Sequence, residues 1–145
     1  MEKITKELKS ISKVLGFIAL YHVSNLVTYI KGLDTLDLST ADAMTQQFMP
    51  VVKALSAIPF VLSALVLVFL CIKGHREAND PSPAKFHIVL AIIWMICSAL
   101  STITSVTEVV KGASLLLVLD MLVAAGTTVL LFFYSKYAKE IRTVK

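Results

Sequence analysis

The sequence is poor in the residues that build metal centres, disulfides and enzyme active sites. It has only two cysteines, Cys71 and Cys97, and both lie in apolar stretches at a spacing that matches no zinc site. It has no GxSxG motif, no paired catalytic carboxylates and no cluster of His, Cys and Asp with metal-ligand spacing. His22 has no second histidine at a matching depth for haem ligation. We therefore expect no enzyme activity, no catalytic residues, no metal and no cofactor.

Charged residues are also scarce, and long apolar runs take their place. Only 17% of the residues are charged and 57% are hydrophobic, and the mean hydropathy of +0.79 exceeds that of soluble domains. Four apolar stretches lie at 13–31, 50–73, 86–108 and 113–136. Each has about 20 residues or more, which at roughly 1.5 Å per residue spans a hydrocarbon core about 30 Å thick. The sequence therefore predicts an all-α polytopic membrane protein, a bundle of four antiparallel transmembrane helices in a single domain over 1–145.

The basic residues are distributed unevenly around these stretches. Eleven of the fourteen Lys and Arg residues lie at the N-terminal end, around the loop 74–85 or at the C-terminal end, whereas the loop 32–49 has three aspartates and no basic residue. Because basic loops stay on the cytoplasmic side of a membrane, we expect both termini in the cytoplasm. The compact chain without sorting motifs favours a bacterial inner membrane. The basic segments adjoin the spans, so we expect them to contact anionic lipid headgroups and not nucleic acid.

Two segments outside the apolar stretches carry expectations of their own. Residues 2–13 place apolar side chains at i, i+4 and i+7, which fits either an amphipathic turn on the membrane surface or a helical extension of the first span. The loop 74–85 contains two prolines, which stop a helix from running through it. His75 and His87 flank this loop, and we expect both to be solvated residues at the membrane interface.

Strongly polar side chains lie inside the spans, where each needs a partner because hydrocarbon offers none. Asp120 is seven residues past the start of its span and Asn25 is six residues before the end of its own, so both lie roughly 10 Å deep. Lys53 and Glu108 lie nearer the same membrane face, which is the outer one in the expected topology. These groups predict a polar pocket that is open to the outside. Its expected residues are Tyr21, Asn25, Lys53, Ser101, Ser105, Glu108 and Asp120.

Two interpretations of this pocket stay open. In the first, small residues let the spans pack closely, and Lys53 pairs with Asp120 or Glu108 as an internal ion pair. Serine and threonine hydroxyls then bond to their own helix backbone. In the second, Asp120 binds a cation or a proton together with Asn25, Tyr21 and hydroxyls of the third span. Lys53 is then the counter-ion of Asp120 or a gate. The expected helix–helix contact residues are Ser98, Thr102, Ala124 and Thr128.

The short loops leave no room for a soluble binding domain, so function must act through helix faces, the loop 32–49 or the basic surface. Our leading hypothesis is a small integral membrane interaction protein, either an accessory or regulatory subunit of a larger complex or a homo-oligomer. Its binding faces would be the small-residue stripe of 86–108 and the outer helix around 44–49. The alternatives are a small oligomeric transporter or channel that uses Asp120, and a membrane immunity protein that binds a secreted toxin through 32–49. The expected partners are the lipid bilayer and another membrane protein or a second copy of the chain.

Overall fold

The structure is a computed structural model that describes residues 2–35, 43–81, 84–112 and 114–144. Within these residues the helices are α1 (Glu2–Asp34), α2 (Ala43–Asn79), α3 (Phe86–Lys111) and α4 (Leu115–Val144). Each contains a stretch that is long and apolar enough to cross a membrane. The expected all-helical fold with four candidate membrane-spanning helices is therefore confirmed.

The first turns of α1 belong to the same continuous helix as its apolar part. They do not form a separate element on a membrane surface, because Leu8 and Ile11 are both buried in the protein. Ser12 lies on the same buried face, and its hydroxyl donates to the carbonyl oxygen of Leu8 at 2.7 Å. Of the two expectations for residues 2–13, the helical extension is the one found.

α2 is longer at both ends than the apolar stretch that predicted it. It begins at Ala43 and continues through Pro50 and Pro59, so the outer helix expected around 44–49 is the first part of α2. Hydropathy marks the part of a helix that can lie in hydrocarbon and not the point where its hydrogen bonds end. It therefore underestimates a helix whose polar ends extend past the apolar part. Residues 36–42, which belong to the loop expected as a toxin-binding surface, lie outside the described residues.

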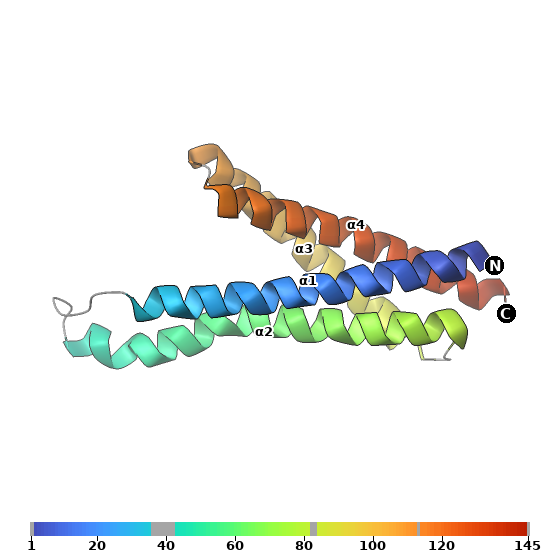
Figure 1. Ribbon diagram of the computed structural model, residues 1–145, viewed down its shortest axis with the longest axis horizontal. Helices are drawn as coiled ribbons and strands as arrows, with labels where there is room; N and C mark the ends of the chain where they lie inside the picture. Colours follow the sequence, from blue (N-terminus) through green and yellow to red (C-terminus); the bar gives the residue numbers. More distant parts are fainter. Residues whose placement is uncertain (1, 36–42, 82–83, 113, 145) are drawn as a thin grey trace.

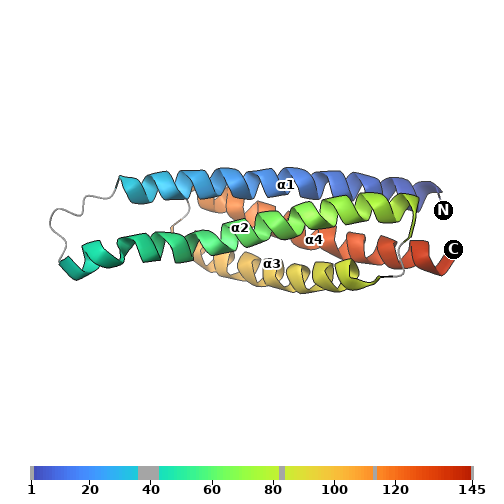
Figure 2. The ribbon, with the colours of Figure 1, turned by 90° about the horizontal axis from the view of Figure 1, so that it is seen from below.

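The helices associate as two pairs. α1 packs along α2 and α3 packs along α4, whereas α1 contacts α4 over a smaller area and α2 makes few contacts with α3 or α4. Figure 1 shows the two pairs converging at the end that holds both termini and diverging towards the α3–α4 connection. Figure 2 shows the ends of all four helices gathered at that same end. We call it the basic end, and we call the opposite end, where the pairs diverge, the open end.

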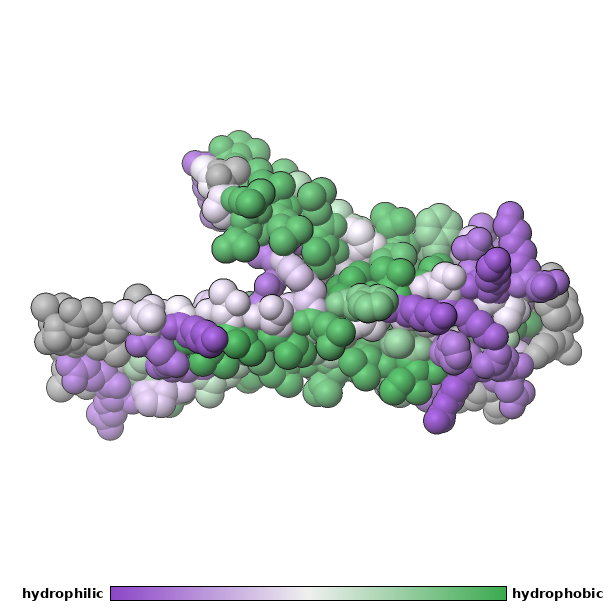
Figure 3. Space-filling view, viewed as in Figure 1, coloured by the Kyte–Doolittle hydropathy of each residue, from purple (hydrophilic) through white to green (hydrophobic). Residues whose placement is uncertain are grey.

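The core lies in the half of the molecule next to the basic end. Its largest fully buried apolar side chains are Leu8, Leu15, Leu67, Leu70, Leu131, Tyr134 and Ile141. In the other half, no described residue within 20–63 or 92–126 is buried. Figure 3 shows hydrophilic residues gathered around the basic end and apolar residues over the middle of the molecule. In the described part of the open half, the two helix pairs therefore share no buried core.

Candidate functional site

A cleft opens where the two helix pairs diverge, and Figure 3 shows it as a notch between them. The cleft contains a cavity of about 210 Å³ with residues of all four helices in its wall. The polar residues of the wall are Tyr21, His22, Asn25, Ser63, Ser98, Ser101, Ser105, Asp120 and Thr127. Phe60 and Trp94 belong to the apolar side. We call this feature the Asp120 cleft.

Asp120 is the acidic residue of the cleft, and two side chains of α1 bind it. Tyr21 donates from its hydroxyl to Asp120 Oδ1 at 2.5 Å, and Asn25 donates from Nδ2 to the same oxygen at 2.9 Å. The two donors are four residues apart, so one face of α1 presents both to α4. Among the described residues, none donates to Asp120 Oδ2 and no basic side chain forms an ion pair with this carboxylate. Asp120 is also exposed, so its second oxygen is open to a further partner.

Several hydroxyl groups in and near the cleft are bonded to their own helices. Thr102, Thr127 and Thr128 each donate to the carbonyl oxygen four residues earlier, at 2.8, 2.7 and 3.0 Å. This agrees with the expectation that serine and threonine hydroxyls bond to their own backbone. A hydroxyl that has given its hydrogen to the backbone keeps its lone pairs. Such hydroxyl groups can accept hydrogen bonds from an incoming ligand but cannot donate hydrogen bonds to it.

Two residues that were expected in the pocket lie outside it. Lys53 forms an ion pair with Asp34 near the open ends of α2 and α1. Glu108 pairs with Lys111, three residues further along α3, at 2.9 Å. The expected ion pair of Lys53 with Asp120 or Glu108 is therefore wrong. The reason is that α2 follows α1 into the open half, which takes Lys53 to the end of α1 and away from α3 and α4.

The other expected residues divide between the cleft and the α3–α4 pair. The structure brings Tyr21, Asn25, Ser101, Ser105 and Asp120 to the wall of one cavity, together with Ser98 and Ala124. Thr102 and Thr128 are half-buried on α3 and α4, which pack along each other. The role of these residues in binding stays a prediction.

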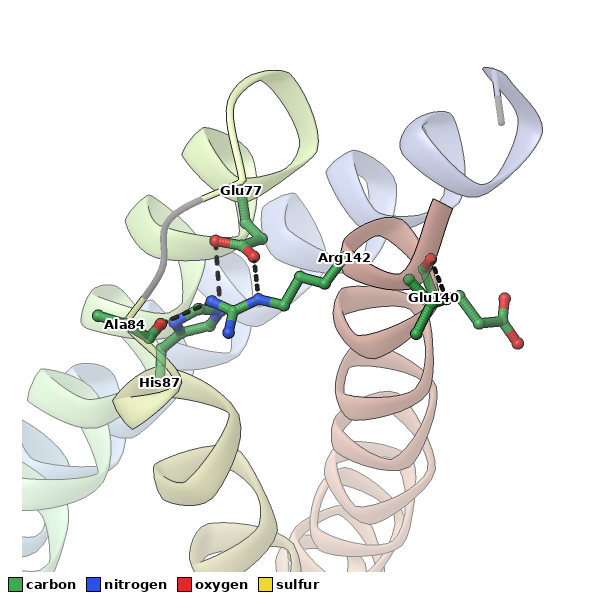
Figure 4. Close-up of polar contacts among 6 residues, drawn as sticks. Glu77, Ala84, His87, Glu140 and Arg142 are labelled. Carbon is green, nitrogen blue, oxygen red and sulfur yellow. Dashed lines mark hydrogen bonds and ion pairs between the residues drawn. The ribbon is translucent and has the colours of Figure 1, made fainter. Parts of the chain in front are cut away.

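A second polar cluster, which the sequence did not predict, joins three helices at the basic end. Arg142 of α4 donates from Nε to Oε1 of Glu77 on α2 at 2.5 Å, and the Glu77 side chain is only 1% exposed. Arg142 also donates from Nη2 to the carbonyl oxygen of Ala84, just before α3, at 2.6 Å. Figure 4 shows the guanidinium between these two acceptors. Such a buried pair ties α4 to the end of α2 and the start of α3.

His87 belongs to this cluster and is not the solvated residue that the sequence predicted. It is buried, and its Nε2 lies 3.7 Å from Glu77 Oε2. Its ring packs edge-on against Tyr134 at 6.1 Å between centroids. The signal in the sequence was periodicity, because His87 shares its helix face with Ala91, four residues later, which is also buried. His75, by contrast, is exposed as expected.

The described residues contain no group of three or more His, Cys, Asp or Glu side chains that could hold a metal ion. The cleft combines one carboxylate with several hydroxyl oxygens and the imidazole of His22, and the carboxylate and hydroxyl oxygens suit a cationic group or a hydrogen-bond donor. Comparison of the chain with protein-family models, curated proteins and solved structures finds no match.

Proposed function

We propose that this chain is an integral membrane interaction protein, an accessory subunit that receives a transmembrane helix of a partner protein in the Asp120 cleft. Its four helices would cross a bacterial inner membrane antiparallel, with both termini and the basic end in the cytoplasm. The clustering of Lys and Arg at the basic end supports this orientation, because basic segments are retained on the cytoplasmic side. The Asp120 cleft would then lie in the outer half of the membrane.

The observation that carries the proposal is the exposed carboxylate of Asp120 in the apolar part of α4, where it is the only charged side chain between Leu115 and Ser135. A charged side chain at mid-membrane costs about 2.5–3.5 kcal/mol on insertion scales. Tyr21 and Asn25 donate hydrogen bonds to Asp120 but bring no positive charge. A Lys or Arg side chain on a partner helix would supply that charge and donate to the second carboxylate oxygen.

The wall of the cleft also supports a helix as the occupant. Ser98, Ser101 and Ser105 follow one another at steps of three and four residues along α3, and all three line the cavity. Small side chains at this spacing let the backbone of another helix approach closely. None of the described residues in the open half is buried, so an added helix would cover polar surface that these residues leave exposed.

Native mass spectrometry of the protein, purified in mild detergent from its own host, tests the proposal. We expect a second polypeptide at fixed stoichiometry with the wild type, and its loss with Asp120→Asn, because the amide removes the charge. Glu108→Gln is the matched control, since it neutralises an exposed carboxylate at the same end but outside the cavity. If the Asp120→Asn variant retained the partner, the partner would not depend on the charge in the cleft, and the proposal would be contradicted.

Photo-crosslinking locates the contact. A photo-crosslinking residue in place of Ser101, in the cleft wall, should capture the same polypeptide. The same residue in place of Ile103, which is 62% exposed but outside the cavity, should not. Equal capture at both positions would mean that the partner does not use the cleft.

A cation or proton pathway is a second candidate, favoured by the 210 Å³ cavity that combines the Asp120 carboxylate with hydroxyl oxygens. It predicts a homo-oligomer without a second polypeptide, and cation- or pH-dependent flux in proteoliposomes that Asp120→Asn abolishes. That pair of results would overturn the accessory-subunit proposal and establish transport in its place.

A further inference from the structure

A second groove lies between α3 and α4 on the surface of the basic end, away from the Asp120 cleft. It consists of two adjoining cavities of about 470 and 430 Å³ that share Ile92 and Lys139 in their walls. The remaining floor is apolar and follows both helices, with Val89 and Met95 from α3 and Phe132 from α4. Val89 and Phe132 are more than half exposed, so this apolar surface is open to the surroundings of the protein.

The mouth of the groove carries positive charge that no described acidic residue balances. Lys85 and Lys139 line it, both are exposed, and neither forms an ion pair within the described part of the chain. Arg142 also reaches the mouth, but Glu77 balances its charge. Lys136 lies 4.0 Å from Glu140, which balances it in the same way. Two ammonium groups at the groove are therefore available to an anion.

The start of α3 adds a further positive contribution at the same place. Lys85 is its N-cap residue, and no side chain caps the free backbone N–H groups of the first turn. The first turn also lacks an acidic residue that would offset the helix dipole. Uncapped N–H groups at the positive end of a helix favour a bound phosphate. The helix terminus and the two lysines thus favour the same kind of ligand.

We propose that this groove binds one anionic phospholipid. Its phosphate would lie between Lys85, Lys139 and the start of α3, and an acyl chain would follow the apolar floor past Ile92 and Met95. Basic pockets between transmembrane helices at the membrane interface recognise anionic headgroups in this way. A soluble phosphate would use the lysines but would gain nothing from the apolar floor. This lipid site is independent of any partner in the Asp120 cleft.

Native mass spectrometry with defined lipids tests the site. Phosphatidylglycerol and phosphatidylcholine of identical acyl chains would be added to the purified protein, and we expect one retained phosphatidylglycerol per chain in preference to phosphatidylcholine. The double variant Lys85→Ala/Lys139→Ala should retain it about 30-fold more weakly. Lys3→Ala/Lys6→Ala is the matched control, because it removes the same charge from the same end of the molecule but outside the groove. If both double variants lost phosphatidylglycerol retention equally, general electrostatic attraction would explain the binding and the proposal would be overturned.

A second variant tests the apolar floor. Val89→Trp should weaken phosphatidylglycerol retention by filling the groove, while circular dichroism reports an unchanged helix content. Glycerol phosphate, which has the same charged group without acyl chains, should not displace the bound lipid. Unchanged retention in Val89→Trp, or displacement by glycerol phosphate, would show that only the charged group is bound and would overturn the lipid assignment.

Discussion

Gly74 of α2 lies between Ser12 of α1 and Tyr134 of α4. A Cβ atom on this glycine would be 2.2 Å from Ser12 Oγ and 2.4 Å from Tyr134 Cε2, distances that no side chain can accept. Both neighbours are fully buried, so neither can move aside without disturbing the core. The missing side chain of Gly74 is therefore what lets these helices approach at the basic end.

The substitution Gly74→Ala should lower the free energy of unfolding by about 1–3 kcal/mol, because it forces overpacking in this core. Unfolding in mixed detergent micelles, followed by circular dichroism, measures it. Gly126→Ala is the control, since a Cβ there meets nothing within 4 Å. It should be neutral or stabilising by up to about 1 kcal/mol, because alanine favours helix over glycine. Equal stability of the two variants would contradict the packing around Gly74.

Charged residues show which ion pairs can be predicted from the sequence and which cannot. The pair Glu108 and Lys111 is local, at i and i+3 on one helix, and such pairs follow from spacing alone. Glu77 and Arg142 are 65 residues apart, and each reads in the sequence as part of a basic, solvated segment. Only the convergence of α2 and α4 makes this pair, so no spacing rule could have found it.

Among the elements, α1 shows most clearly that an apolar stretch and a helix are different things. The stretch 13–31 predicted the membrane-crossing part, while the helix begins at Glu2 and its first turns enter the core. Their spacing of apolar residues fitted both a surface turn and a buried extension. The choice between them depends on whether α2 and α4 pack against the apolar face of these turns. That packing is a property of the tertiary structure and not of the segment.

Leu8→Ala should lower the free energy of unfolding by about 2 kcal/mol, because a fully buried side chain leaves a cavity. The lower end of the range for buried leucines is expected, since removal of apolar groups from water contributes less in a membrane. Phe17→Ala is the comparison, because Phe17 is 70% exposed on the same helix and should change stability by about 0.5 kcal/mol or less. The same unfolding assay applies. A Leu8→Ala protein as stable as the wild type would favour the surface-turn interpretation.

For the whole molecule, the decisive feature is that the two helix pairs share a core at the basic end and separate at the open end. The buried residues, the Glu77–Arg142 cluster and the groove proposed to bind a lipid all lie in the half next to the basic end. The Asp120 cleft lies in the other half because the pairs have separated there. Stability and the proposed partner contact are thus placed in different halves of the molecule.

The proposed orientation can be measured with single cysteines in a variant with Cys71 and Cys97 replaced by alanine. Lys111→Cys, at the open end, should react with a membrane-impermeant maleimide on intact cells. Arg76→Cys, at the basic end, should react only after permeabilisation. Both side chains are exposed, so accessibility within the protein does not bias the comparison. The reverse pattern would contradict the cytoplasmic termini, and equal labelling at both positions would contradict the antiparallel arrangement.

The sequence by itself determined the all-helical fold and the four apolar helices, because length and hydropathy are local properties of each segment. It also singled out Asp120, Asn25 and Tyr21, because polar groups stand out in apolar stretches. Tertiary structure alone decided which partners these groups have. In the folded chain, Lys53 pairs with Asp34 and His87 is buried beside Glu77. The cleft forms where the helix pairs diverge. The physical reason is that partner choice depends on crossing angles between helices, which arise from packing over the whole molecule and are not encoded in any single span.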